Sequence, residues 1–198
     1  QGYGRFFGQG SMAVLSKHPI RIEEVQDFSP FLWRDLPLAH LPEVEGQVFP
    51  SEEAIAVQRL HAHGAWVIPI DHPAIGVVTV MTYHASPPVF DGPEDRNGKR
   101  NHDETLFWVH LLDGLIGEPP AAPFVLVGDA KLDPAGGDGL GQAMQRLLSH
   151  PKLQEPFPGR PTVTFAQTGP LRVDYVLPSA DWVIEAADVM PADPQASR

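Results

Sequence analysis

Two runs of mostly apolar residues dominate the hydrophobic pattern of the chain. Residues 124–128 read Phe-Val-Leu-Val-Gly, and Val77, Val78, Val80 and Met81 dominate residues 76–83. A continuous apolar run of this length is typical of a strand that is buried on both faces of a sheet. Each run is followed by a titratable side chain, Asp129 after the first and His84 after the second. The pattern therefore predicts two central strands with polar residues at their carboxyl ends.

A third strand is predicted over residues 171–178, where polar and apolar residues alternate. Asp174 falls on the face opposite Tyr175, inside an otherwise apolar strand. A buried carboxylate must be paired, because burial of an isolated charge is costly. If the three strands are neighbours, His84, Asp129 and Asp174 meet at one edge of the sheet.

Helical patterns are short by comparison. Ser51, followed by two glutamates, is a helix-start signal, and residues 140–148 carry leucine and methionine at helical spacing. A longer helix is predicted to begin at a cap formed by Asn101 or Asp103 and to end at a following glycine. Strands outnumber helices, so the predicted fold class is α/β (α+β), with stacked sheets flanked by helices.

Composition adds limits to this picture. The chain has 198 residues without a repeat or a linker, which indicates a single domain over 1–198, and its 22 Pro and 18 Gly indicate many loops. The formal net charge is −11 with only 14 Lys and Arg, which disfavours a long basic groove for DNA. The absence of cysteine excludes a disulfide partner and thiolate chemistry, and it fits a periplasmic or secreted protein.

Several polar residues allow a structural and a functional interpretation. Asp129 precedes a loop rich in glycine and proline that contains Asp133, which suits a metal or phosphate site but equally suits turn-forming aspartates. His84 either acts chemically or is satisfied by a backbone carbonyl. His61 and His63 are two residues apart and could bind a metal, although such pairs more often lack the third ligand that a zinc site needs.

A cluster of cationic and amide side chains surrounds the start of the longer helix: Arg96, Asn97, Arg100 and Asn101. Guanidinium and amide groups suit the binding of a phosphate or a carboxylate. The alternative is a loop that is held together by its own Asp and Arg pairs. With a histidine and two carboxylates nearby, the functional interpretation is metal-assisted attack of water on a phosphate ester.

Four motifs, in order along the chain, resemble those of the endonuclease/exonuclease/phosphatase superfamily. Residues 128–131, Gly-Asp-Ala-Lys, resemble its Gly-Asp-x-Asn, and residues 172–175, Arg-Val-Asp-Tyr, resemble its Arg-(Ile/Leu/Val)-Asp-Tyr strand. His84 matches its histidine after a central strand, and residues 10–20 resemble its Gly-x-Ala-(Val/Ile)-Leu-Ser-(Arg/Lys)-x-Pro hairpin. Residues 87–104 are similar to a bacterial branch whose members often carry export signals.

This resemblance implies a four-layer α/β/β/α sandwich of two mostly antiparallel sheets and Mg²⁺- or Mn²⁺-dependent hydrolysis. It implies that Asp129 is a metal ligand and orients or activates the attacking water. His84 would bind the scissile phosphate, and Asp174 would orient a catalytic histidine from later in the chain. The candidate substrate contacts are Arg96, Asn97, Arg100 and Asn101.

The sequence departs from the family pattern in two respects. The Asn and the metal-binding Glu of two early strands, and the closing Ser-Asp-His segment, are not found, so the resemblance implies a domain truncated at both ends and inactive by itself. Lys131 replaces the Asn of the Gly-Asp-x-Asn motif. Lysine offers only donors and a positive charge, whereas Asn both donates and accepts. Lys131 is therefore a catalytic candidate that either binds phosphate as a point charge or disfavours a neighbouring metal.

The leading functional hypothesis is metal-dependent hydrolysis of a phosphoester of the phosphodiesterase, nuclease or phosphatase type. The predicted substrates are a phosphorylated small molecule, a lipid head group or nucleic acid, and the acidic charge disfavours the last. One alternative is a catalytically silent member of the same fold that binds a phosphorylated ligand or a protein. Another is a β-rich domain that binds carbohydrate or protein.

Overall fold

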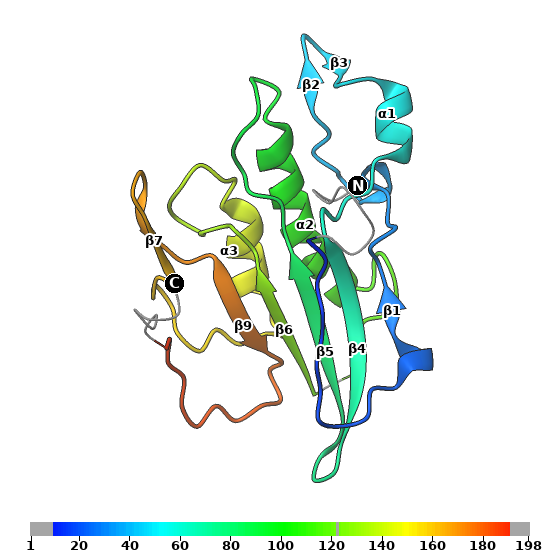
Figure 1. Ribbon diagram of the computed structural model, residues 1–198, viewed down its shortest axis with the longest axis vertical. Helices are drawn as coiled ribbons and strands as arrows, with labels where there is room; N and C mark the ends of the chain where they lie inside the picture. The colour runs from blue at the N-terminus through cyan, green and yellow to red at the C-terminus, as the bar shows by residue number, and fades with distance from the viewer. Residues whose placement is uncertain (1–9, 122, 191–198) are drawn as a thin grey trace.

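A five-stranded sheet forms the centre of the protein in the computed structural model, which describes residues 10–121 and 123–190 (Figure 1). The strands lie in the order β1-β4-β5-β6-β9. Their bounds are Gln26–Asp27, Gly64–His72, Gly76–His84, Phe124–Asp129 and Asp174–Pro178. Strands β5 and β6 pair in parallel and the other neighbours pair antiparallel. The prediction of a mostly antiparallel sheet is confirmed.

The two apolar runs form the central strands β5 and β6, as predicted, and His84 and Asp129 are their last residues. Strand β4 runs to His72 and includes Pro69. Pro69 pairs with Thr79, whose N–H points away from β4 to the carbonyl of Pro123. Pro69 therefore faces away from β5, toward the segment that contains Arg21, whose N–H donates to the Pro69 carbonyl at 3.0 Å; no bond between β4 and β5 needs the missing N–H of the proline.

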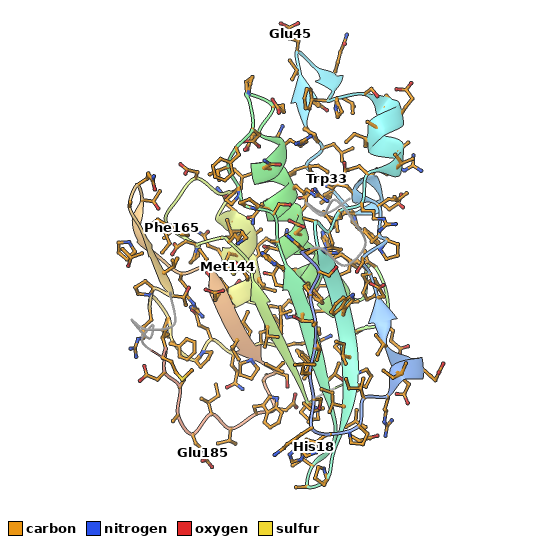
Figure 2. All side chains as sticks on the ribbon, viewed as in Figure 1. His18, Trp33, Glu45, Met144, Phe165 and Glu185 are labelled. Atoms are coloured by element: carbon orange, nitrogen blue, oxygen red, sulfur yellow. The ribbon has the colours of Figure 1, made fainter. Side chains whose placement is uncertain are left out.

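Helices α2, Arg96–Leu112, and α3, Gln142–Leu148, cover one face of this sheet. The ring of Tyr83 on β5 lies 5.4 Å from the ring of Trp108 on α2, and Met144 of α3 is fully buried beside the strands (Figure 2). Helix α1, Glu52–Val57, lies outside the sheet, and the Ser51 hydroxyl accepts from the backbone N–H of Ala54 at 3.3 Å. The predicted cap at Ser51 is confirmed.

The start of α2 differs from the prediction. The helix begins at Arg96, and Asn101 and Asp103 lie inside it with their side chains completely buried. Both residue types favour caps because they bond to nearby backbone. Here they reach other elements: Asn101 donates to two distant carbonyls, and Asp103 accepts from the indole N–H of Trp33 at 2.7 Å. Tertiary contacts thus replace local capping.

The remaining elements are small. They are the 3₁₀ turns Ile22–Glu24 and Trp33–Asp35, the hairpin of β2, Glu43–Val44, with β3, Gln47–Val48, and the hairpin of β7, Val163–Phe165, with β8, Gly169–Leu171. The predicted hairpin over residues 10–20 does not form. Residues 11–19 have no regular structure, and this segment joins the sheet through a single bridge between Ile20 and Ile70.

The two faces of the sheet differ in their burial. The face toward α2 and α3 is fully buried, whereas apolar side chains on the other face remain partly exposed: Trp66, Val78, Val80, Val125 and Val127. The described residues thus provide one helical layer and one sheet layer, with an apolar surface of the kind against which a second sheet packs. The predicted α/β (α+β) class is confirmed, and these layers are half of the four-layer sandwich.

Candidate functional site

Three polar residues form a row across neighbouring strands. His84 pairs in register with Asp129, and Asp129 pairs with Asp174. The adjacent row, which contains Tyr83 and Tyr175, is buried against the helices, so alternation places the polar row on the opposite face. The structure therefore brings together the three residues that the sequence analysis expected at one edge of the sheet.

The carboxylate of Asp129 is the centre of this row. Its Oδ2 atom lies 2.8 Å from Lys131 Nζ and 3.3 Å from His84 Nε2. Its Oδ1 atom and His84 Nε2 are enclosed, and neither has a hydrogen-bond partner among the described residues. Burial lowers the pKa of His84 in spite of the opposing effect of Asp129, so the ring is neutral at neutral pH. A neutral ring beside an unsatisfied carboxylate oxygen is suited to a ligand that completes both.

Lys131 is held in an unusual backbone conformation, with a φ of 50°. Its N–H lies 3.2 Å from the carbonyl of Val173, which also accepts from Ala130 at 2.8 Å, so the loop is tied to the residue before β9. Left-handed φ values are uncommon for residues other than Gly, and Asn is several-fold enriched there. The fold at this position therefore favours the Asn of the family motif, and lysine occupies it at a cost in backbone strain.

His63, which the sequence analysis considered only as a metal ligand together with His61, lies beside His84 in the structure. Its ring stacks on His84 with centroids 4.0 Å apart and planes 9° apart, and its Nδ1 lies 3.2 Å from the carbonyl oxygen of His84. Burial lowers the pKa of His63. His61 instead packs its ring edge on Phe107, so the two histidines do not form a metal pair. The contact between His63 and His84 arises because Gly64 of β4 pairs with His84 of β5, and the sequence alone does not show this pairing.

Helix α2 fixes the chain just beyond both catalytic candidates. The Asn101 amide donates to the carbonyl of Ser86 at 2.7 Å and to that of Ala130 at 2.8 Å. The Glu104 carboxylate accepts from the N–H groups of Ser86 at 2.6 Å and Ala62 at 2.7 Å. Burial raises the pKa of Glu104, against the backbone donors and the Arg100 charge. Two side chains on one helix thus position the ends of β5 and β6.

The four predicted substrate contacts lie on or near this scaffold. Asn101 is buried, as described, and Arg100 donates to the carbonyls of Leu60 at 2.7 Å and Arg59 at 2.9 Å. Asn97 donates through its amide to Val89 at 2.8 Å, whereas Arg96 is exposed. Three of the four therefore hold backbone in place. Their contact with a substrate stays a prediction.

Two aspartates have environments that the sequence did not reveal. Asp174 is exposed, so the expectation of a buried, paired carboxylate is wrong; β9 lies at the edge of the described sheet. Asp133 accepts from the N–H groups of Ala135 and Gly136 at 2.8 Å and from that of Arg172 at 2.8 Å. This is the turn-forming alternative, and it uses both carboxylate oxygens of Asp133.

A second polar cluster lies away from the row. Ligand atoms of His40, His102 and Asp103 lie within 4.8 Å of one another, close enough to hold a metal ion. Asp103 already accepts from Trp33 and from the backbone of His40, both at 2.7 Å, and its other oxygen is 2.8 Å from His102 Nδ1. The cluster is therefore satisfied without an ion, and it anchors the segment around Trp33 to α2.

Comparison with known proteins identifies the family of the chain. The sequence matches the Endonuclease/Exonuclease/phosphatase family over residues 1–197. The chain therefore belongs to this family, and its fold is that of phosphoester hydrolases. No curated protein matches the sequence. Among the described residues, no helix is long and apolar enough to cross a membrane.

Solved structures with similar folds are distant in sequence. They include an endonuclease/exonuclease/phosphatase from Beutenbergia cavernae (19% identity, 59% of this chain and 32% of that chain, TM-score 0.44). Sphingomyelinase C from Streptomyces griseocarneus has 15% identity over 64% and 44% of the two chains (TM-score 0.44). A hairpin deletion mutant of Staphylococcus aureus beta toxin has 12% identity over 66% and 50% (TM-score 0.45). The chain spans between a third and a half of these proteins.

Proposed function

We propose that this site hydrolyses a phosphoester by attack of water, with Mg²⁺ or Mn²⁺ as cofactor. The observation that supports the proposal is the row His84–Asp129–Asp174, in which a carboxylate oxygen and an imidazole nitrogen are enclosed and unsatisfied. Family membership agrees with this class of reaction. In the reaction, the water oxygen bonds to phosphorus and gives up a proton, the bond from phosphorus to the leaving oxygen breaks, and the leaving oxygen takes up a proton from solvent water.

The residues of the row would have different roles in the reaction. Asp129 orients the attacking water and accepts its proton, and His84 hydrogen-bonds a phosphoryl oxygen through Nε2, which has no hydrogen-bond partner among the described residues. Lys131, whose ammonium lies 2.8 Å from Asp129 Oδ2, would contact the same phosphoryl group. Asp174, exposed beside Asp129, would orient a histidine that the described residues do not supply. Arg96 is the one of the four proposed substrate contacts whose side chain is exposed.

The donor set fits a hard divalent cation. Mg²⁺ is commonly held by one or two carboxylates, with water and substrate phosphate completing its shell. Asp129 Oδ1 is unsatisfied, and the exposed carboxylate of Asp174 stands on the neighbouring strand. Two like charges opposite each other are unfavourable without a cation. The cation would neutralise charge on the phosphoryl oxygens.

A silent binding member of the same fold is the second candidate, and Lys131 favours it. Its ammonium lies on Asp129 Oδ2, where a cation already compensates the carboxylate. Such a protein would retain phosphate affinity without hydrolysis.

The test compares variants of the intact protein on phosphomonoesters and phosphodiesters with Mg²⁺ or Mn²⁺. We expect Asp129→Asn and His84→Ala each to lower kcat/KM at least about 100-fold, or about 2.7 kcal/mol, and the exposed Asp181→Asn to leave it unchanged. Wild-type protein that binds phosphate but hydrolyses no ester would establish the silent alternative.

Lys131→Asn separates the two roles of the lysine, with the exposed Lys17→Asn as the matched control. A gain in hydrolysis and tighter Mn²⁺ binding by calorimetry would show that Lys131 competes with the metal. A loss of hydrolysis would show that the ammonium takes part in the reaction.

A further inference from the structure

A cavity of about 700 Å³ opens beside the polar row. One wall carries Asp129, Lys131 and Asp174. The remaining lining comes from three elements: the loop after β5 and the β7–β8 hairpin supply most of its apolar side chains, and the loop after β6 supplies glycines together with Asp133 and Asp138. The reactive groups thus lie at the margin of a space that is much larger than a phosphoryl group and is shaped by hydrophobic side chains.

Phe90 forms part of this apolar wall, although its side chain is largely exposed and its backbone is strained. Its side chain is 90% exposed, and its φ is 70°, a genuine outlier for a bulky residue. Asn97 holds the residues on both sides: its amide donates to the carbonyl of Val89, and its N–H donates to the carboxylate of Asp91. Backbone strain that is maintained by surrounding contacts concentrates at functional sites.

The hairpin supplies the other aromatic side chain. Phe165, at the end of β7, is 44% exposed and lines the same cavity, where Figure 2 shows it on the outlying hairpin. Leu171 on β8 and Val163 on β7 extend the apolar surface inward toward Val173 and Asp174. An extended apolar group that starts at the polar row would therefore lie between two aromatic rings.

The charges of the lining restrict the ligand further. Four aspartates line the cavity, Asp129, Asp133, Asp138 and Asp174, and Lys131 is the one cation among the lining residues. A second phosphate would meet carboxylates without a compensating positive charge. A polyanion such as nucleic acid is therefore disfavoured, whereas a ligand with one phosphoryl group is compatible.

We propose that the site takes phosphoesters with a single phosphoryl group and an apolar alkyl, acyl or aryl substituent, which lies between Phe90 and Phe165. This inference rests on the proposed function for the reaction, but its recognition of the apolar group can be measured without turnover. The gain per methylene is about fourfold for complete burial. In an open cavity we expect about half of that free energy, or roughly twofold per methylene.

The experiment uses the intact protein and 4-nitrophenyl alkyl phosphodiesters from methyl to hexyl. We expect kcat/KM to rise roughly 30-fold along the series, which adds five methylenes at about twofold each. In parallel, calorimetry compares hexyl phosphate with methyl phosphate below the micellar concentration, which reports binding whether or not hydrolysis occurs. An oligonucleotide serves as the polyanionic competitor, and a thymidine phosphodiester serves as the competitor that tests stacking of a base.

The variants Phe90→Gly and Phe165→Ala test whether the two aromatic side chains contact the apolar substituent. Phe90→Gly relieves the left-handed strain, so we expect a stability equal to or above wild type together with a five- to tenfold loss for hexyl but not methyl compounds. Leu38→Gly is the matched control, because Leu38 is also an exposed apolar residue at positive φ but does not line the cavity. We expect Leu38→Gly to change the values neither for the hexyl compounds nor for the methyl compounds.

The outcomes separate the two proposals. Hydrolysis without chain-length dependence would overturn this inference and leave the proposed function intact. Chain-length-dependent binding without hydrolysis would support the inference and contradict the proposed function. A preference for the oligonucleotide, or equal binding of methyl and hexyl phosphate, would overturn the inference. If short-chain esters in solution and phospholipid in vesicles are both substrates, the ligand class extends to membrane lipids; activity on the soluble esters alone restricts it to free amphiphiles.

Discussion

Replacement of Asn101 by leucine tests how the site is assembled. The two side chains are similar in size, but leucine cannot donate to the carbonyls of Ser86 and Ala130, which Asn101 contacts at 2.7 and 2.8 Å. Each buried carbonyl that loses its donor costs about 1–3 kcal/mol. Asn101 Oδ1 itself has no partner among the described residues, so its removal recovers part of this loss. We expect the free energy of unfolding to fall by about 2–4 kcal/mol.

Urea unfolding, followed by the fluorescence of the four tryptophans, measures this change. We expect a lower midpoint with an unchanged slope, since the surface exposed on unfolding stays the same. A local effect should accompany it. The Ala85 N–H donates to the Asp129 carbonyl at 3.0 Å, and its hydrogen exchange should accelerate when the two strand ends are no longer joined by Asn101.

The exposed amide Gln142 provides the control, because Gln142→Leu removes an amide that faces solvent. We expect a change below about 0.5 kcal/mol for that variant. A loss of less than 1 kcal/mol in Asn101→Leu, with unchanged exchange at Ala85, would refute the assignment of Asn101 as the link between β5 and β6.

Three further predictions concern stability. Burial lowers the pKa of His61 to about 3, so the folded state releases a proton that the unfolded chain binds below about pH 6.5. The unfolding free energy should therefore fall by about 1.4 kcal/mol per pH unit as pH drops from 6.5 toward 3, and urea titrations should show that His61→Phe removes this component. Gly128→Ala should lower stability by about 1–3 kcal/mol in thermal melts, because a Cβ there would lie 2.6 Å from the Tyr83 carbonyl oxygen; an unchanged Tm would contradict the reported packing. Ser51→Ala should cost about 1 kcal/mol through loss of the N-cap, and an equal midpoint in urea would show that the cap is dispensable.

The central strands could be predicted because burial on both faces leaves a simple pattern in the sequence. Runs of apolar residues ended at Asp129 and His84, and the structure places both residues at strand ends in one row. Alternation likewise predicted that Tyr175 and Asp174 lie on opposite faces, and the structure confirms this. The predicted burial of Asp174 was wrong, because β9 lies at the edge of the described sheet and leaves this carboxylate exposed. The position of the row thus follows from strand pattern, since adjacent strands with polar ends bring those ends together.

The supporting residues could not be predicted in the same way. Asn101 and Asp103 are common capping residues, and nothing local in the sequence shows that they bond to segments far away in the chain. The ring of His63 reaches the site only because β4 pairs with β5. Arg100 is similar: its guanidinium suits phosphate by chemistry, yet it donates to the backbone before β4. Residue type defines what a side chain can bind, and tertiary pairing decides which partner it meets.

The side chain of Lys131 is long enough to contact more than one group of the site. Its ammonium contacts Asp129 Oδ2 and leaves Oδ1 unsatisfied, and its flexible four-carbon stem can carry the charge away from the carboxylate. A divalent ion carries twice the charge and would compete well for a carboxylate oxygen. The displaced ammonium could then contact the phosphoryl group that the ion also neutralises. Replacement of Asn by Lys is therefore compatible with hydrolysis.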